Sequence, residues 1–101
     1  MKIELKMAKG YAEIRDEWRT KNETKYLEAL YLDGQMSPLS FLRANRVLAL
    51  ELTEKIVIDE KEIAVSTDSL DELYPKDYDV IVGACVKIQA KFSLNNPEKK
   101  N

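Results

Sequence analysis

The side chains that usually carry reactions at neutral pH are almost absent from this sequence. It contains no His and one Cys, Cys85, which falls among apolar residues with no basic neighbour closer than Lys87. A Ser, Thr or Cys nucleophile needs a base within hydrogen-bond reach, and without His only dispersed Lys and carboxylate groups are left for that role. No such pair is visible along the sequence. We therefore expect that the protein is not an enzyme and that Cys85 packs as a small apolar side chain.

Carboxylates are the only plentiful candidate metal ligands, and their spacing does not suit an ion. Asp77 and Asp79 are two residues apart on an expected helix, so their side chains diverge. The segment from Asp68 to Glu72 lacks the glycine and the alternating oxygen ligands of a calcium loop. Acidic residues in the first turn of a helix are stabilised by the helix dipole, which explains them without a metal. We expect no metal ion and no cofactor.

The formal net charge is only -2, but it is unevenly distributed along the chain. Residues 51–79 carry ten acidic side chains against three lysines, whereas residues 1–25 carry seven basic side chains against five acidic ones. An acidic segment of this kind repels a phosphate backbone and attracts a basic protein surface. A solvated acidic face that keeps a small protein soluble is an equally good interpretation.

Aromatic residues beside this acidic segment are the best candidates for contact with a partner. Tyr74 and Tyr78 stand at an expected helix start, where an aromatic ring with acidic neighbours could grip a basic amphipathic helix. Trp18 and Tyr74 are either half-buried core or exposed anchors, and the core interpretation is favoured. The predicted partner-binding residues are Tyr74, Tyr78, Asp71, Glu72, Asp77 and Trp18.

The first half of the chain predicts a hairpin followed by two helices. Residues 1–14 alternate charged with apolar positions, which indicates a β-hairpin with Gly10 at a positive-φ turn position. Apolar residues then recur at helical spacing from about 20 to 32, before Asp33-Gly34 supplies a stop. Ser37-Pro38 begins a helix that should end at about Leu52, with a broad apolar face that includes Leu39 and Leu42.

The second half predicts another hairpin and a C-terminal amphipathic helix. Two β-branched runs within residues 55–65 indicate a hairpin with a four-residue turn from Asp59 to Glu62. Ser66 or Asp68 can cap a short helix, and Pro75 begins the last one. In that helix, apolar residues recur at intervals of three and four, so one face should be buried.

These elements predict a small, helix-rich α+β domain with two short β-hairpins, in residues 1–94, followed by a frayed polar tail in residues 95–101. The amino terminus does not look like a signal peptide, and the longest uncharged apolar run, residues 80–86, is too short to span a bilayer. We expect a cytoplasmic protein with a protein partner. Neither a membrane nor nucleic acid is expected as a partner, and homo-oligomerisation is left open.

An alternative function is a small helix-turn-helix DNA-binding regulator that uses the helix over residues 38–52. Arg43, Asn45 and Arg46 would then contact bases in the major groove. The connection from Asp33 to Pro38 is longer than the usual tight turn, and the chain lacks a concentrated basic region for phosphate binding.

Taken in order, the elements resemble the small tail assembly chaperones of long-tailed bacteriophages. The similarity consists of the N-terminal hairpin, the mid-chain helix, the strand pair from Ile56 to Ile63, and the approach to the last helix, Leu70-Asp-Glu-Leu-Tyr-Pro-Lys-Asp-Tyr-Asp79. The resemblance implies a non-enzymatic protein of virion morphogenesis. Such a chaperone binds the long, helical tape measure protein and keeps it soluble in the host cytoplasm until tail-tube subunits polymerise around it. It also implies a second, frameshifted form, for which Glu98-Lys99-Lys100 is a suitable place.

Overall fold

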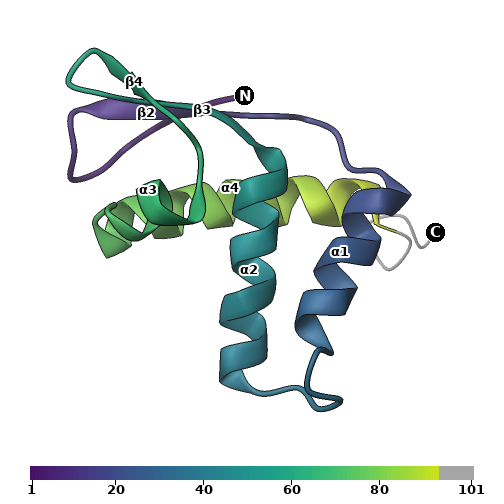
Figure 1. The fold of residues 1–101 in the computed structure, drawn as a ribbon. Helices are drawn as coiled ribbons and strands as arrows, with labels where there is room; N and C mark the ends of the chain where they lie inside the picture. The colour runs from purple at the N-terminus through teal and green to yellow at the C-terminus, as the bar shows by residue number, and fades with distance from the viewer. Residues whose placement is uncertain (94–101) are drawn as a thin grey trace.

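A computed structural model describes residues 1–93 of the chain, in which strands and helices alternate in pairs (Figure 1). The elements are β1 (Lys2–Glu4), β2 (Gly10–Ile14), α1 (Thr20–Leu30), α2 (Pro38–Leu52), β3 (Thr53–Ile58), β4 (Lys61–Ile63), α3 (Thr67–Asp71) and α4 (Pro75–Phe92). This is the α+β class that the sequence predicts. The tail predicted for residues 95–101 lies outside the described residues.

The two predicted hairpins are parts of one antiparallel sheet with the strand order β1-β2-β3-β4. They are joined because β2 pairs with β3, which places Ala12 opposite Ile56 and Tyr11 opposite Val57. Since side chains alternate along a strand, these two rows face opposite sides of the sheet. Ala12 and Ile56 are fully buried against the helices, whereas Tyr11 and Val57 are partly exposed. The sheet therefore has one packed face and one open face.

Gly10 is not the turn residue that the sequence predicts. It lies in β2 opposite Ile58, and Gly34 is the glycine of the described chain that adopts a positive φ, at 74°. A Cβ atom at position 10 would come within 1.9 Å of the carbonyl oxygen of Val57. Glycine is thus required there because two backbones approach closely, and not because of a turn.

The second hairpin has a two-residue turn instead of the predicted four-residue turn. Asp59 and Glu60 have φ angles of 52° and 67°, and Ile58 pairs directly with Lys61 on either side of them. Left-handed conformations at both central residues are typical of the tight turns that match the twist of a hairpin. The error arose because Lys61 and Glu62 are polar, although both belong to strand β4.

The helix boundaries agree closely with the sequence signals. Helix α2 begins at Pro38 behind the N-cap Ser37, whose hydroxyl accepts the N–H of Ser40, and it ends at Leu52 as predicted. Helix α1 ends at Leu30, two residues before the predicted end, and Gly34 takes the left-handed conformation that was assigned to it. The chain passes from α2 into β3 without a loop.

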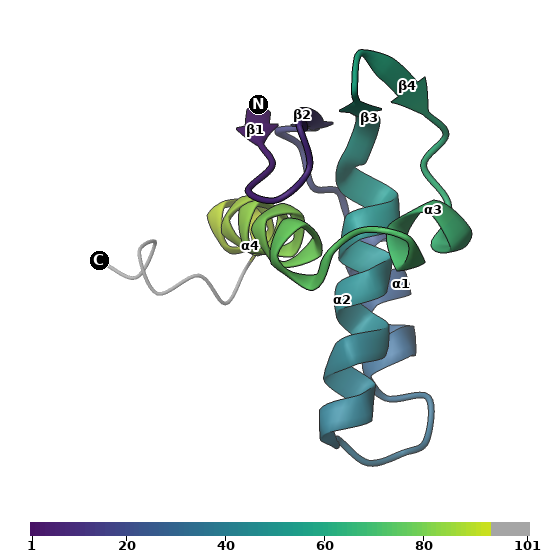
Figure 2. The ribbon, with the colours of Figure 1, turned by 90° about the vertical axis from the view of Figure 1, so that its left-hand side faces the viewer.

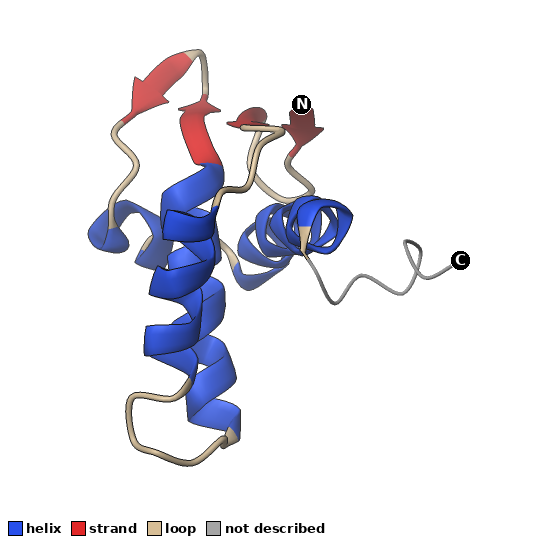
Figure 3. Cartoon of the chain, turned by 90° about the vertical axis from the view of Figure 1, so that its right-hand side faces the viewer, coloured by secondary structure: helices blue, strands red, loops and turns tan. Residues whose placement is uncertain are grey.

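The core lies between the sheet, the sheet-proximal part of α2, and α4. Its fully buried side chains include Leu48, Ile56, Ile81, Cys85 and Ile88. Helix α4 crosses the half of α2 that lies nearest the sheet, and the rest of the α1–α2 pair projects beyond it (Figures 2 and 3). Among residues 1–93, no helix combines the length and apolar character needed to cross a membrane.

Candidate functional site

Asp77 is not a surface residue, so its assignment as a partner-binding residue is wrong. Its side chain is fully buried, and its carboxylate accepts backbone N–H groups from Lys6 at 2.6 Å, Met7 at 2.7 Å and Ala8 at 2.9 Å. Burial alone would raise the pKa of this carboxyl, but the three N–H donors outweigh burial and leave the pKa below its usual value. Asp77 therefore fastens the β1–β2 loop to the first turn of α4.

Trp18 is also part of the core, as the favoured of its two interpretations predicts. Its assignment as a partner-binding residue is therefore wrong. The side chain is 7% exposed, and its indole N–H donates to Glu23 Oε1 at 2.8 Å. The rings of Trp18 and Tyr26 form a T-shaped pair with 6.5 Å between their centroids. Trp18 thus anchors the connection between the sheet and α1.

Arg46 brings together two of the predicted residues, Asp71 and Tyr78. Its guanidinium lies 2.8 Å from Asp71 Oδ1, and its Nε donates to the hydroxyl of Tyr78 at 3.1 Å. A third donation, at 3.4 Å, reaches the carbonyl oxygen of Thr67. These contacts hold α3 and the start of α4 against the middle of α2. Arg46 is therefore a structural link, and Asp71 keeps an exposed side chain beside it.

Tyr74 and Glu72 remain on the surface, where the sequence predicts a docking site. Tyr74 is 57% exposed and precedes α4 without a side-chain capping bond. Together with Met7, Lys9 and the turn at Asp59, these two residues line a hollow of about 430 Å³. The aromatic ring is thus accessible to a partner.

The two helices of the alternative DNA-binding interpretation form a hairpin whose arginines are engaged within the protein. Arg43 Nε donates to the carbonyl oxygen of Ala29 at 2.7 Å, and its terminal nitrogen lies 3.3 Å from Asp33. Arg46 is held by α3 and α4 as described above. Both arginines that would contact bases therefore serve to join helices.

The most unusual surface of the molecule was missed by the sequence analysis. Seven large apolar side chains near the far end of the α1–α2 hairpin are exposed, and we call them the hairpin tip: Leu27, Tyr31, Leu32, Met36, Leu39, Phe41 and Leu42. The sequence places Leu39 and Leu42 on the broad apolar face of this helix, but each is 63% exposed because α4 crosses α2 nearer the sheet. The periodicity of a buried helix face is the same as that of a docking face, so the pattern alone could not separate them.

A shallow apolar hollow continues this surface along the side of the hairpin. Its volume is about 360 Å³, and its lining includes Ala29, Leu32, Val47 and Leu50. Exposed apolar side chains gathered along one segment of a small domain are typical of a site of protein or membrane contact. The hairpin tip is accordingly the candidate functional site.

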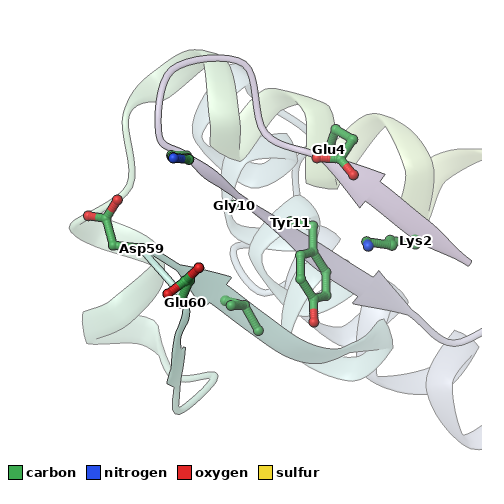
Figure 4. Close-up of a pocket in the computed structure, with 8 residues that line it drawn as sticks. Lys2, Glu4, Gly10, Tyr11, Asp59 and Glu60 are labelled. Carbon is green, nitrogen blue, oxygen red and sulfur yellow. The ribbon is translucent and has the colours of Figure 1, made fainter.

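A hollow of about 480 Å³ lies over the open face of the sheet, and its lining includes Glu4, Tyr11 and Glu60 (Figure 4). Tyr11 stands in its centre with the ammonium group of Lys2 4.2 Å from the ring centroid, while Glu60 lies at the β3–β4 turn. Elsewhere, burial raises the pKa of the Cys85 thiol to about 12 against the opposing effect of the Thr53 hydroxyl, so Cys85 stays protonated. No three potential metal-ligating side chains cluster within residues 1–93.

Comparison with known proteins adds no functional assignment, because no protein-family model, curated protein sequence or solved structure matches this chain.

Proposed function

We propose that this chain is a non-enzymatic binding protein that covers an apolar segment of a client protein with its hairpin tip. The resemblance to phage tail assembly chaperones gives the client a class: a long, helical tape measure protein that must stay soluble in the host cytoplasm until the tail tube forms. The observation that supports the proposal is the concentration of exposed apolar side chains between residues 27 and 42.

The hairpin tip suits this role because it is separate from the elements that keep the domain folded. The core is built from the sheet, α4 and the sheet-proximal half of α2. Helices α1 and α2 hold each other through the bond from Arg43 to Ala29 and the ion pair between Lys25 and Glu51, with 3.4 Å between the charged atoms. The tip is therefore presented on an ordered scaffold, which lowers the entropic cost of binding.

Co-expression with a tape measure protein tests the proposal. Leu32→Ser combined with Leu39→Ser should reduce the soluble fraction of the client several-fold, because binding energy concentrates in a few apolar anchors. The control is Val86→Ser, which removes an exposed apolar side chain outside the tip. Both variants should change the free energy of unfolding by only about 0.5 kcal/mol per site, since all three side chains are on the surface.

The two variants separate the proposal from general stickiness of the protein. If the tip variant keeps the client as soluble as the unmodified chain does, the hairpin tip is not the client-binding surface. If the control variant is equally impaired, solubility depends on scattered apolar residues and the proposal also fails.

A further inference from the structure

One stripe of α2 runs from the hairpin tip directly to α3. Leu39, Leu42 and Arg46 are spaced by three and four residues, so they share one face of the helix. Leu39 and Leu42 are well exposed, whereas the head group of Arg46 is held by Asp71 and Tyr78. The stripe is therefore open at the hairpin tip and closed at Arg46, near the middle of α2, by α3 and the start of α4 (Figure 2).

The closed end of the stripe is acidic. Helix α3 and the residue after it carry Asp68, Asp71 and Glu72, all of them exposed. Asp71 is held beside Arg46, which lies four residues, or about 6 Å of helical rise, from Leu42 along α2. Arg46 supplies one positive charge against these three negative ones, so the group is net negative and attracts cationic side chains.

We propose that the stripe of Leu39 and Leu42, together with the acidic residues of α3, is the docking site for an amphipathic helix with a basic flank. The apolar side of that helix would lie on the two leucines, and its Lys or Arg side chains would reach Asp68, Asp71 and Glu72. This inference rests on the proposed function and specifies the client segment that the hairpin tip receives.

The charge and shape of the surface favour this occupant over the alternatives. An exposed apolar ridge on a helix suits another helix, which packs along it through residues spaced by three and four. The adjacent carboxylates favour a cationic partner and oppose nucleic acid or an anionic membrane surface. Because the charges lie at one end of the stripe, they also fix the direction in which the client helix lies.

A pair of synthetic peptides tests the inference. Both have the same leucine stripe and a length of about 20 residues, enough to span a small domain as a helix, but one carries Lys and the other Glu at its flanking positions. Fluorescence anisotropy with the full chain should show that the Lys peptide binds about tenfold or more tightly than the Glu peptide. Its affinity should fall as the salt concentration rises from about 0.05 to about 0.5 M.

Two variants of the chain locate the contact. Leu39→Ser with Leu42→Ser should remove most binding of both peptides, whereas Asp71→Asn with Glu72→Gln should selectively weaken the Lys peptide several-fold. The matched control is Glu4→Gln with Glu60→Gln, which removes the same charge beside the hollow over Tyr11 (Figure 4). Circular dichroism should show that all three variants remain folded.

Equal binding of the two peptides, or an equal effect of the control variant, would overturn the inference. Sedimentation equilibrium adds another decisive outcome: a dimer that Leu39→Ser with Leu42→Ser dissociates would mean that a second copy of this chain covers the stripe. The client-solubility experiment tests the proposed function independently of the peptide experiment. If the tip variant lowers client solubility but the peptides show no charge preference, the proposed function stands and the docking site is wrong.

Discussion

Met7 donates its backbone N–H to the carboxylate of Asp77 at 2.7 Å, across 70 positions of the chain. Lys6 and Ala8 donate to the same carboxylate, so one side chain satisfies three consecutive N–H groups of the β1–β2 loop. The contact joins the first hairpin to the last helix and closes the sheet over the core. A buried charge is tolerated there because its hydrogen bonds replace those it would make with water.

Asp77→Asn should therefore destabilise the protein by about 2 to 4 kcal/mol, because it removes the charge and leaves buried N–H donors poorly satisfied. Chemical denaturation measures the change. Asp79→Asn is the matched control, since Asp79 is exposed two residues further along the same helix. An equal loss in the two variants would contradict the role that the structure gives to Asp77.

The same carboxylate predicts a dependence on pH. Its pKa is lowered in the folded protein, so the stabilisation is complete above the usual pKa of an Asp and is lost as the pH falls through the lowered value. The stability difference between the unmodified chain and Asp77→Asn should be constant from neutral pH to about pH 4 and then shrink. Melting curves at a series of pH values test this, and a difference that grows with acid would contradict it.

Two glycines should respond in opposite directions to the same substitution. Gly10→Ala places a methyl group against the backbone of Val57 and should destabilise the protein by about 1 to 3 kcal/mol or more. Gly83→Ala meets no atom within 4 Å in the exposed middle of α4, so it should stabilise by about 0.5 to 1 kcal/mol. Thermal melts of the two variants provide the measurement. Similar shifts in both would show that β2 and β3 are not in close contact at position 10.

The sequence predicted the elements well because their signals are local. Ser37-Pro38 begins α2, and Pro75 begins α4, since capping and the geometry of proline act within one turn. The joining of two hairpins into one sheet depends instead on the pairing of Tyr11 with Val57, which no local pattern contains. Gly10 was misassigned for the same reason, because its constraint comes from a strand far along the chain.

The candidate site was harder to predict because exposure depends on where helices cross. Leu39 and Leu42 have the spacing of core residues, and only the position of α4 leaves them uncovered. Asp77 was read as a surface acid at a helix start, yet the loop folded over it makes it the most buried carboxylate of the described chain. Tyr74, in contrast, is 57% exposed, so the favoured core interpretation is wrong for this residue.

The arginines of α2 yield a test of the alternative DNA-binding function. Because Arg43 and Arg46 are held by Ala29, Asp33, Asp71 and Tyr78, we expect no salt-dependent retardation of duplex DNA at about 0.15 M salt. Arg43→Ala should instead lower stability, since it removes a bond between α1 and α2. Specific, saturable DNA binding below about 1 µM that Arg43→Ala with Arg46→Ala abolishes would reverse this assignment.

The last prediction contrasts a core residue and a surface residue that are seven positions, or about two helical turns, apart. Ile81 is fully buried, so Ile81→Ala should leave a cavity and cost about 2 to 5 kcal/mol, a large part of the stability of a small domain. Tyr74 precedes α4 with its ring largely in solvent, so Tyr74→Ala should cost less than about 1 kcal/mol.

The effects of the two variants on client solubility should follow the opposite order to their effects on stability. At a temperature where both variants are folded, Tyr74→Ala should reduce the soluble client more than Ile81→Ala does, because its ring adjoins Glu72 at the acidic end of the proposed docking site. The two readouts are the soluble client after co-expression and the melting temperature of each variant alone. If Tyr74→Ala lowers the melting temperature as much as Ile81→Ala, its ring is part of the core. If it leaves the client fully soluble, the docking site does not extend to the start of α4.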